Sequence, residues 1–333
     1  MADLTLPKIG TPQIKLLERL CTACAVSGDE GEVRKIVIEE IKAYADSYKV
    51  DALGNLLATR QAQPTSKRGS KNKPLRVLLA AHMDEVGFMI SADDKDGFFR
   101  FEVVGGVDAG MLIAKPVVIG KDHLKGVIGA KPIHLTTASE RKTAITLESL
   151  RIDTGNGGNG KVKIGDRATF APIFSTIGQG NTRSFRSKAL DDRIGVANLI
   201  ELVKNPPPNV ELLVAFTVQE EVGLRGAEVA AFTFDPDLAI ALDCTPAADL
   251  PPYHDDDENT RYNTRLDAGP AIYTVDRGTL SDPRLVRHFT ETGDALGIPY
   301  QYRQPGGGGT DAGAMHKARA GIPSLSVSVP GRY

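Results

Sequence analysis

The spacing of apolar positions changes along the chain and predicts regions of different structure. Residues 11–25 and 29–44 carry apolar side chains at helical spacing, with charged side chains on the opposite side of the second segment, so we expect two helices there. Residues 77–81 form a short apolar run after a polar loop that contains proline, which indicates a buried strand.

The region from residue 87 to residue 182 has a different pattern. Short β-rich pieces alternate there with glycine and other turn residues, without long helical patterns. We expect a small all-β, barrel-like domain inserted in the chain. The pieces expected to form strands are 98–104, 115–120, 125–129 and 161–170.

Beyond residue 184, helical and strand patterns alternate again. This alternation predicts an α/β fold with a mostly parallel sheet that is covered by helices on both faces. We therefore expect residues 1–86 and 183–333 to form one discontinuous catalytic domain, interrupted by the β-rich residues 87–182. The expected helices are 190–203 and 282–296, and the expected strands are 210–218, 237–243 and 324–329.

Composition and charge exclude several classes of protein. The chain has 333 residues, of which 41% are hydrophobic, so it can bury a large core. Its formal net charge of −2 gives no support for a nucleic-acid partner or an anionic membrane. The sequence has neither the pattern of a secretory signal nor an apolar run near the roughly 20 residues that span a bilayer. We expect a cytoplasmic protein.

The cysteines suggest neither a disulfide framework nor a metal site. Their number, three, is odd. Cys21 and Cys24 have the spacing of a Cys-x-x-Cys motif, but they lie within a helical pattern without thioredoxin-like context. We therefore expect no redox or zinc role for this pair.

Two adjacent carboxylates, Glu220 and Glu221, stand directly after an apolar strand and before a glycine. A carboxylate beside a core is costly unless it is paired or binds a metal. Because neighbouring side chains point in different directions, one can face a metal while the other faces a water molecule. A metallohydrolase divides the roles of ligand and general base in this way. The alternative is a solvated loop after an edge strand.

Three further signals carry the same chemistry. His82 and Asp84 follow an apolar run, where the imidazole can bind a metal and the carboxylate can orient it. Asp191 and Asp192 open a predicted helix, where a carboxylate can bridge two cations, and Asp243 ends a predicted strand. Taken singly, each signal also fits a solvated strand end, a helix N-cap or a structural aspartate.

Together these side chains predict one site. In open α/β sheets, sites form beyond the carboxyl ends of the strands. One histidine per metal with several carboxylates suits zinc or cobalt, whereas ligation by oxygen alone would suit magnesium or calcium. We expect two divalent metal ions per subunit.

Five motifs, in order along nearly the whole chain, resemble those of the M42 family of metallo-aminopeptidases, the glutamyl and tetrahedral aminopeptidases. The combination is specific, although each motif alone is not. The resemblance implies a dinuclear, metal-dependent enzyme that removes the N-terminal residue from peptides. The motifs are His-Met-Asp-Glu-Val-Gly at 82–87, Lys-Ala-Leu-Asp-Asp-Arg at 188–193, Gln-Glu-Glu-Val-Gly-Leu-Arg-Gly-Ala at 219–227, Asp243, and Gly-Gly-Thr-Asp-Ala at 308–312.

The resemblance also implies a role for each residue of the site. Glu220 would be the general base, and Asp84 would orient His82. The inserted β domain would serve dimerisation, and the dimers would assemble into a homo-oligomer, in many family members a tetrahedral dodecamer. The implied metal ligands are His82 and Asp243 on one ion, Glu221 on the other, and Asp191 bridging both.

The sequence departs from the family pattern after Arg332-Tyr333. The family continues with a histidine that completes the second metal site, whereas this sequence ends at Tyr333. In a chain without that histidine, we expect the ion on Glu221 to bind weakly or not at all. This departure raises the alternative of a metal-poor, non-enzymatic assembly protein. A dinuclear deacylase on the same fold is a further alternative, because it would use the same ligands.

Overall fold

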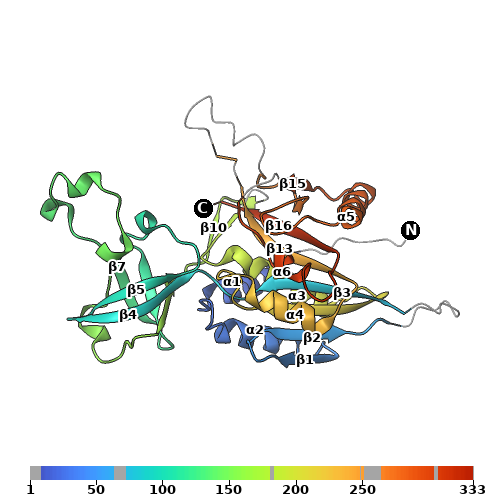
Figure 1. The fold of residues 1–333 in the computed structure, drawn as a ribbon, viewed down its shortest axis with the longest axis horizontal. Coiled ribbons are helices and arrows are strands. Elements are labelled where there is room, and N and C mark those ends of the chain that lie inside the picture. Colours follow the sequence, from blue (N-terminus) through green and yellow to red (C-terminus); the bar gives the residue numbers. More distant parts are fainter. Residues whose placement is uncertain are drawn as a thin grey trace.

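The computed structural model describes residues 9–63, 73–180, 184–247, 249–250, 264–303 and 307–332. A large mixed sheet covered by helices forms the body of the molecule, and a closed β-barrel projects from one end of it (Figure 1). None of the helices in this described part is long and apolar enough to cross a membrane.

Eight strands form the large sheet. In sheet order they are β1 (Ser47–Val50), β2 (Leu56–Arg60), β12 (Val210–Thr217), β3 (Leu75–His82), β13 (Leu238–Pro246), β16 (Ser324–Gly331), β14 (Ala271–Tyr273) and β15 (Gln301–Arg303). The four central strands, β12, β3, β13 and β16, are parallel. β2 and β14 run antiparallel to their central neighbours, so the sheet is mixed at both sides of its parallel centre.

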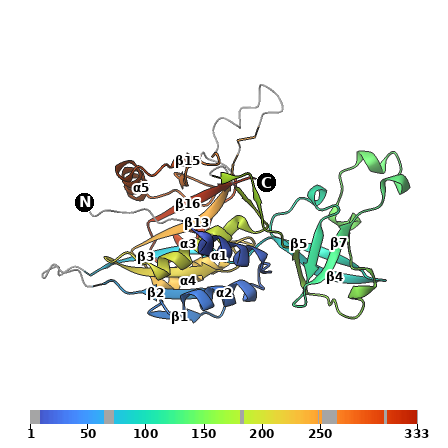
Figure 2. The same ribbon diagram turned by 180° about the vertical axis from the view of Figure 1, so that it is seen from behind.

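Helices cover both faces of the sheet (Figure 2). One face is covered by α1 (Thr11–Thr22), α2 (Gly31–Ile41) and α3 (Leu190–Lys204), and the other by α4 (Arg225–Phe234) and α6 (Ala312–Met315). α5 (Pro283–Leu296) contacts β14 and β16. The expected α/β class, with a mostly parallel sheet between two helical layers, is confirmed.

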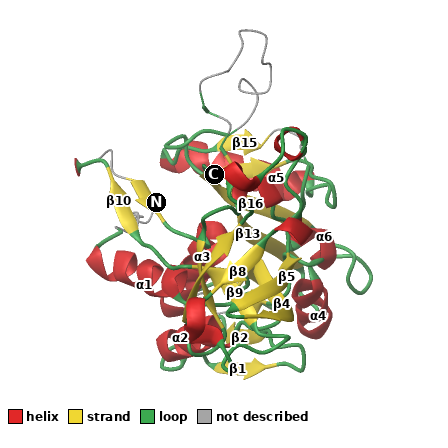
Figure 3. Cartoon of the chain, turned by 90° about the vertical axis from the view of Figure 1, so that its left-hand side faces the viewer, coloured by secondary structure: helices red, strands yellow, loops and turns green. Residues whose placement is uncertain are grey.

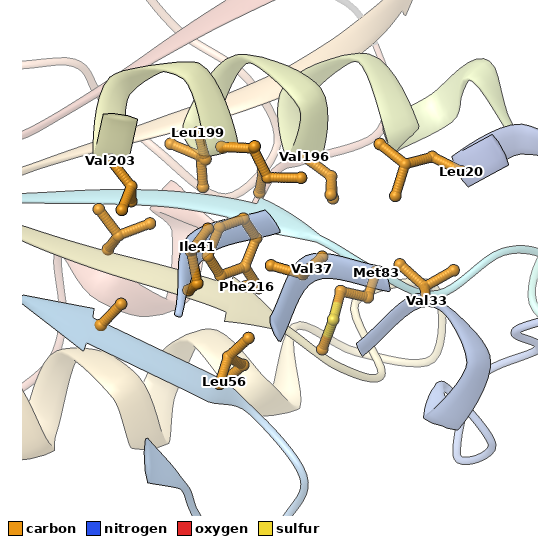
Figure 4. Packing of buried hydrophobic residues seen from close by; sticks show 14 of the residues in the cluster. Leu20, Val33, Val37, Ile41, Leu56, Met83, Val196, Leu199, Val203 and Phe216 are labelled. Carbon is orange, nitrogen blue, oxygen red and sulfur yellow. The ribbon is translucent and has the colours of Figure 1, made fainter. Parts of the chain in front are cut away.

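Large apolar side chains fill the core on the first face (Figure 4). Leu20 of α1, Val37 of α2, Leu199 of α3 and Phe216 of β12 are fully buried there. Burial of one such side chain contributes roughly 1.5–3 kcal/mol. The second face is instead lined mainly by alanine, including Ala227 and others of α4, so helices pack close to the sheet.

The barrel closes through six strands around its own aromatic core. Phe88 and Phe101 meet edge to face there, with ring centroids 5.1 Å apart. Figure 3 views the molecule from the barrel side. Around the barrel the strands are β4 (Gly87–Lys95), β5 (Phe98–Val104), β8 (Arg151–Asp153), β7 (Leu124–Gly129), β6 (Pro116–Ile119) and β9 (Arg167–Phe170).

One expected barrel strand is shorter than the sequence pattern suggests. Residues 161–170 were expected to be extended, but the strand covers only Arg167–Phe170. The preceding residues form a turn, in which the Lys163 amide donates to the Asp166 carboxylate at 2.8 Å and Gly165 has a φ of 93°. The charged and glycine residues of this segment therefore form a turn rather than extending the strand.

The barrel follows directly on the central strand β3, because β4 begins five residues after His82. The Thr169 hydroxyl of β9 donates to the buried Glu85 carboxylate at 2.9 Å, and Glu85 also forms an isolated β-bridge with Val26 of the body. The carboxyl end of β3 thus lies where the barrel joins the body. The expected end of the inserted segment, between residues 182 and 183, falls outside the described residues.

Candidate active site

His82 is the last residue of β3, and two carboxylates from other elements meet its imidazole ring. His82 Nε2 lies 3.0 Å from Asp191 Oδ1, at the start of α3, and 3.7 Å from Asp243 Oδ1, on β13. The ligand atoms of these three residues all lie within 4.8 Å of one another. His82 and Asp243 are buried, while the Asp191 side chain is 54% exposed, so solvent reaches this group.

The two aspartates that open α3 face different surroundings. Asp191 faces the His82 ring, whereas Asp192 is fully buried and accepts hydrogen bonds from the His82 amide at 3.2 Å and the Gly195 amide at 2.9 Å. A Cβ atom on Gly195 would lie 2.4 Å from the Asp192 carboxylate oxygens, so this position needs glycine. Asp192 therefore anchors α3 to β3 and leaves Asp191 as the accessible carboxylate.

Asp84 contacts both the histidine and the pair of glutamates. Its backbone carbonyl lies 3.1 Å from His82 Nδ1, and its carboxylate Oδ1 lies 3.6 Å from the same nitrogen. The carboxylate accepts hydrogen bonds from the backbone amides of Glu220 at 3.0 Å and Glu221 at 3.2 Å. The Ser27 hydroxyl donates to it as well, at 2.6 Å. The Asp84 side chain thus holds the glutamate loop more directly than it holds the imidazole.

Glu220 and Glu221 stand three and four residues after the end of β12, and both are partly buried. The loop that carries them is fixed from behind, because Val218 donates its amide hydrogen to Asn55 Oδ1 and Asn55 Nδ2 donates to the Gly226 carbonyl. Glu221 is not part of the three-residue group around His82 among the described residues. Its carboxyl nevertheless interacts electrostatically with His82 and Asp191.

The site gathers more buried acids than one imidazole can neutralise. Burial raises the pKa of Glu220 to about 10, and repulsion from Asp243 and Asp311 acts in the same direction. Burial and neighbouring carboxylates also raise the pKa of Asp243 and of Glu221 to about 7. The pKa of His82 lies well above its ordinary value, because hydrogen bonds to carboxylates outweigh the effect of burial. Burial is the largest cause of these acidic shifts, and repulsion between the clustered carboxylates adds to it.

Asp311 is a further buried acid of the site. The sequence suggested no role for it. It lies just before α6, is 2% exposed, and accepts a hydrogen bond from the Thr217 hydroxyl at 2.5 Å. Its Oδ1 atom is buried and has no hydrogen-bond partner among the described residues. Burial raises its pKa to about 6. The available signal was the motif at 308–312, which contains this aspartate after two glycines.

The composition of the site suits divalent cations. One imidazole and several carboxylates converge, and repulsion between the acids contributes to the raised pKa values of Glu220 and Asp243. A bound divalent ion would relieve that repulsion, since ligation favours the ionised carboxylate. The residues that could hold ions in this way are His82, Asp191, Asp243 and Glu221.

A second layer of buried charge lies behind the site. Both Glu85 carboxylate oxygens lie 2.8 Å from Lys188 Nζ, and Oε1 also lies 3.4 Å from Arg193 Nη2. All three side chains are at most 6% exposed. Lys188 and Arg193 flank the two aspartates in sequence, so Glu85 ties the start of α3 to the barrel junction. The sequence pattern alone gave no sign of such a role for Glu85.

Comparison with known proteins finds relatives along nearly the whole chain. A model of the family described as M42 glutamyl aminopeptidase matches residues 64–333. A putative aminopeptidase of Acetivibrio thermocellus is 38% identical over 323 residues, which cover 96% of this chain and 90% of that protein.

Solved structures resemble the fold closely. A TET aminopeptidase from the marine sediment archaeon Thaumarchaeota archaeon SCGC AB-539-E09 has a TM-score of 0.87 at 33% identity and covers 97% of this chain and 90% of its own. The TET1 peptidase of Pyrococcus horikoshii, which can assemble into a tetrahedron or a large octahedral shell, has a TM-score of 0.79 at 34% identity. That match covers 96% of this chain and 92% of the other.

Proposed function

Because the chain belongs to the M42 family of peptidases and is therefore a peptide hydrolase, we propose that it is a dinuclear metal-dependent aminopeptidase with Glu220 as its general base. Its substrates would be peptides with a free N-terminus. The family membership favours this reading over a deacylase or a non-enzymatic assembly protein.

The position of Glu220 is the observation that carries the proposal. The residue follows the central strand β12, its amide is bound by the Asp84 carboxylate at 3.0 Å, and its carboxyl interacts with Asp243 and Asp311. Glu220 thus lies in the acidic cluster around His82 without belonging to the three-residue group of ligand atoms. A proton acceptor beside such a group can act on water without being a ligand itself.

Two ions in this cluster would be held by His82 and Asp243 on one side, by Glu221 on the other, and by Asp191 between them. Ions bound there would lower the pKa of a water molecule and polarise the substrate carbonyl. A ligand set of one imidazole with carboxylates supports zinc or cobalt rather than magnesium or calcium.

Glu220 performs the proton transfers of the reaction. Its carboxylate takes a proton from the attacking water, whose oxygen forms a bond to the first peptide carbonyl carbon. The carbon–nitrogen bond then breaks, and Glu220 returns the proton to the leaving amine. Burial and neighbouring carboxylates raise the pKa of Glu220 to about 10 in the metal-free protein, so nearby cations would have to lower it before the ionised side chain could act as the base.

A panel of substrates with and without metal tests this function. Purified protein treated with a chelator should lose hydrolysis of aminoacyl-p-nitroanilides, and added zinc or cobalt should restore it. The restored protein should cleave free N-terminal peptides and leave N-acylated amino acids intact. Preferential cleavage of the acylated compounds would support the deacylase instead, and failure on both sets would contradict the proposal.

We further propose that residues 87–182 form the dimerisation domain of a homo-oligomer, with dimers that assemble into a dodecamer. The similar TET1 peptidase assembles into closed shells, which supports such an arrangement. Large apolar side chains on the barrel are exposed in the single chain, among them Ile133 at 71%, Met111 at 62% and Leu135 at 60%. Sedimentation of the purified protein tests this proposal, and we expect an oligomer. A variant with Ile133→Asp and Leu135→Asp should dissociate, whereas a monomeric parent protein would contradict the proposal.

A further inference from the structure

A second group of metal-binding side chains lies outside the cluster around His82. Cys24 follows α1, Glu32 lies in the first turn of α2, and His123 lies in the turn between β6 and β7 of the barrel. The thiol, carboxylate and imidazole ligand atoms of these residues all lie within 4.8 Å of one another. Three separate segments, two from the body and one from the barrel, therefore converge on one point.

Glu32 stands between the other two residues and is held by both. Its Oε1 lies 2.5 Å from His123 Nε2, and its Oε2 accepts a hydrogen bond from the Cys24 backbone amide at 2.9 Å. The Glu32 and His123 side chains are about two-fifths exposed, and Cys24 is partly buried. The carboxylate is thus already oriented toward the imidazole, and solvent has access to the group.

A cavity of about 310 Å³ adjoins Cys24 and Glu32, which line it together with Gly120 and Lys121 of the barrel turn. Asp29 and Arg167 line the same cavity, so its wall carries carboxylates as well as cations. The space is large enough for an ion and coordinated water, since one water molecule occupies about 30 Å³ of liquid volume.

We propose that Cys24, Glu32 and His123 form a separate site for one divalent transition-metal ion, with zinc as the best match. Sulfur, imidazole nitrogen and carboxylate oxygen are the three ligand types of protein zinc sites, and water can take the fourth tetrahedral position. A thiolate ligand disfavours magnesium and calcium, which prefer oxygen. This ligand set differs from the proposed catalytic one, which contains no sulfur.

The two cysteines of the Cys-x-x-Cys motif lie in different surroundings. Cys21 is fully buried in the body, whereas Cys24 belongs to the group with Glu32 and His123. The helical pattern around the motif and the lack of thioredoxin-like context gave no sign of a zinc role. The imidazole that completes the group lies 99 residues after Cys24, and only folding brings it there.

An ion at this site would link the barrel to the body. Its ligands come from the loop after α1, from α2, and from a barrel turn, so binding would restrict movement of the barrel relative to the helices. The proposal does not depend on the aminopeptidase function. Its expected consequence is structural, with stabilisation of the folded state by mass action when the ion is present.

Cobalt provides a direct test, because a thiolate ligand gives bound Co²⁺ a sulfur-to-metal charge-transfer band that oxygen and nitrogen ligands do not. The full chain, stripped with a chelator and kept reduced, is titrated with Co²⁺ under near-ultraviolet detection. We expect the band to appear and to reach the amplitude of one thiolate-bound ion per chain, while Co²⁺ taken up by the proposed catalytic site adds nothing to it. We expect it to be lost in Cys24→Ser and in His123→Asn, where asparagine tolerates the φ of 49° at this position.

His134→Asn is the matched control, because His134 is another histidine of the barrel and lies outside the group. It should keep the band at full amplitude. Absence of the band in the parent protein would overturn the proposal. Persistence in either ligand variant, or an equal loss in the control, would overturn it as well.

Discussion

The Asp84 carboxylate accepts a hydrogen bond from the Glu220 backbone amide at 3.0 Å. Its other oxygen accepts from the Glu221 amide at 3.2 Å, and the backbone carbonyl of Asp84 lies 3.1 Å from His82 Nδ1. One residue therefore fixes the proposed base, the proposed ligand beside it and the imidazole relative to one another. The relative positions of the groups in the site therefore depend on Asp84 as well as on the ligands.

Substitution of Asp84 by asparagine should disturb all three groups. An amide nitrogen cannot accept a hydrogen bond, so one of the two glutamate amides loses its acceptor. We expect kcat/KM for an aminoacyl-p-nitroanilide to fall by about 10- to 100-fold, and zinc affinity to fall as well. Ser27→Ala, which removes only a donor to the same carboxylate, serves as the control and should cost less than Asp84→Asn. Equal losses in the two variants would mean that Asp84 does not position the loop.

Metal binding should release protons and weaken as the pH falls. Burial raises the pKa of Asp243 and of Glu221 to about 7 in the metal-free protein, and a ligand must be deprotonated to bind. We expect zinc to bind more weakly at pH 6 than at pH 8. Calorimetry in two buffers with different ionisation enthalpies counts the released protons. Equal affinity at the two pH values, without proton release, would contradict the electrostatic description of the site.

The same pKa shifts determine how the stability of metal-free protein depends on pH. The folded-state pKa values of Asp243, Glu221 and Asp311 lie above those of unfolded carboxyls, near 4. The folded state therefore binds more protons between about pH 4 and pH 7, and the free energy of unfolding falls as the pH rises through that range. We expect a higher denaturant midpoint at pH 5.5 than at pH 7.5. An opposite slope would show that these acids are already neutralised within the chain.

Glu85→Gln should destabilise the fold strongly. It leaves the buried Lys188 and Arg193 side chains without their counter-charge, a change that typically costs ~3–5 kcal/mol. Denaturant unfolding of metal-free protein measures the effect apart from metal binding. Lys131→Gln, which breaks the half-exposed pair with Glu140, should change stability little. Similar effects of the two substitutions would contradict a structural role for the buried network.

The sequence predicted the strand-end placement of the site because apolar runs stop where the strands stop. The runs at 77–81 and 210–218 correspond to β3 and β12, and His82 and Glu220 lie at or just beyond the ends of these strands. Parallel strands bring their carboxyl ends to one edge, so the convergence of these side chains followed from the fold class. The short edge strands were not predicted, because residues such as those of β15 become extended only against a neighbouring strand.

The roles of Asp311 and Glu85 could not be predicted from the local sequence pattern. Asp311 stands before a helix of only four residues, which has no detectable periodicity, and its burial depends on Thr217 from a distant strand. Glu85 acquires its partners from the start of α3 and the residue two positions before it, both about 100 residues away, and from the barrel, 84 residues away. Side chains whose neighbours come from other elements become recognisable only in the folded structure.

The most direct test of the assigned base is Glu220→Gln, measured together with metal content. Glutamine keeps the size of the side chain but cannot take a proton from water. We predict that kcat falls by about 10²- to 10⁴-fold while zinc occupancy per chain stays at the parent value. Glu228→Gln, on the exposed side of α4, should leave both unchanged. Turnover near the parent rate in Glu220→Gln, with metal bound, would contradict the central claim.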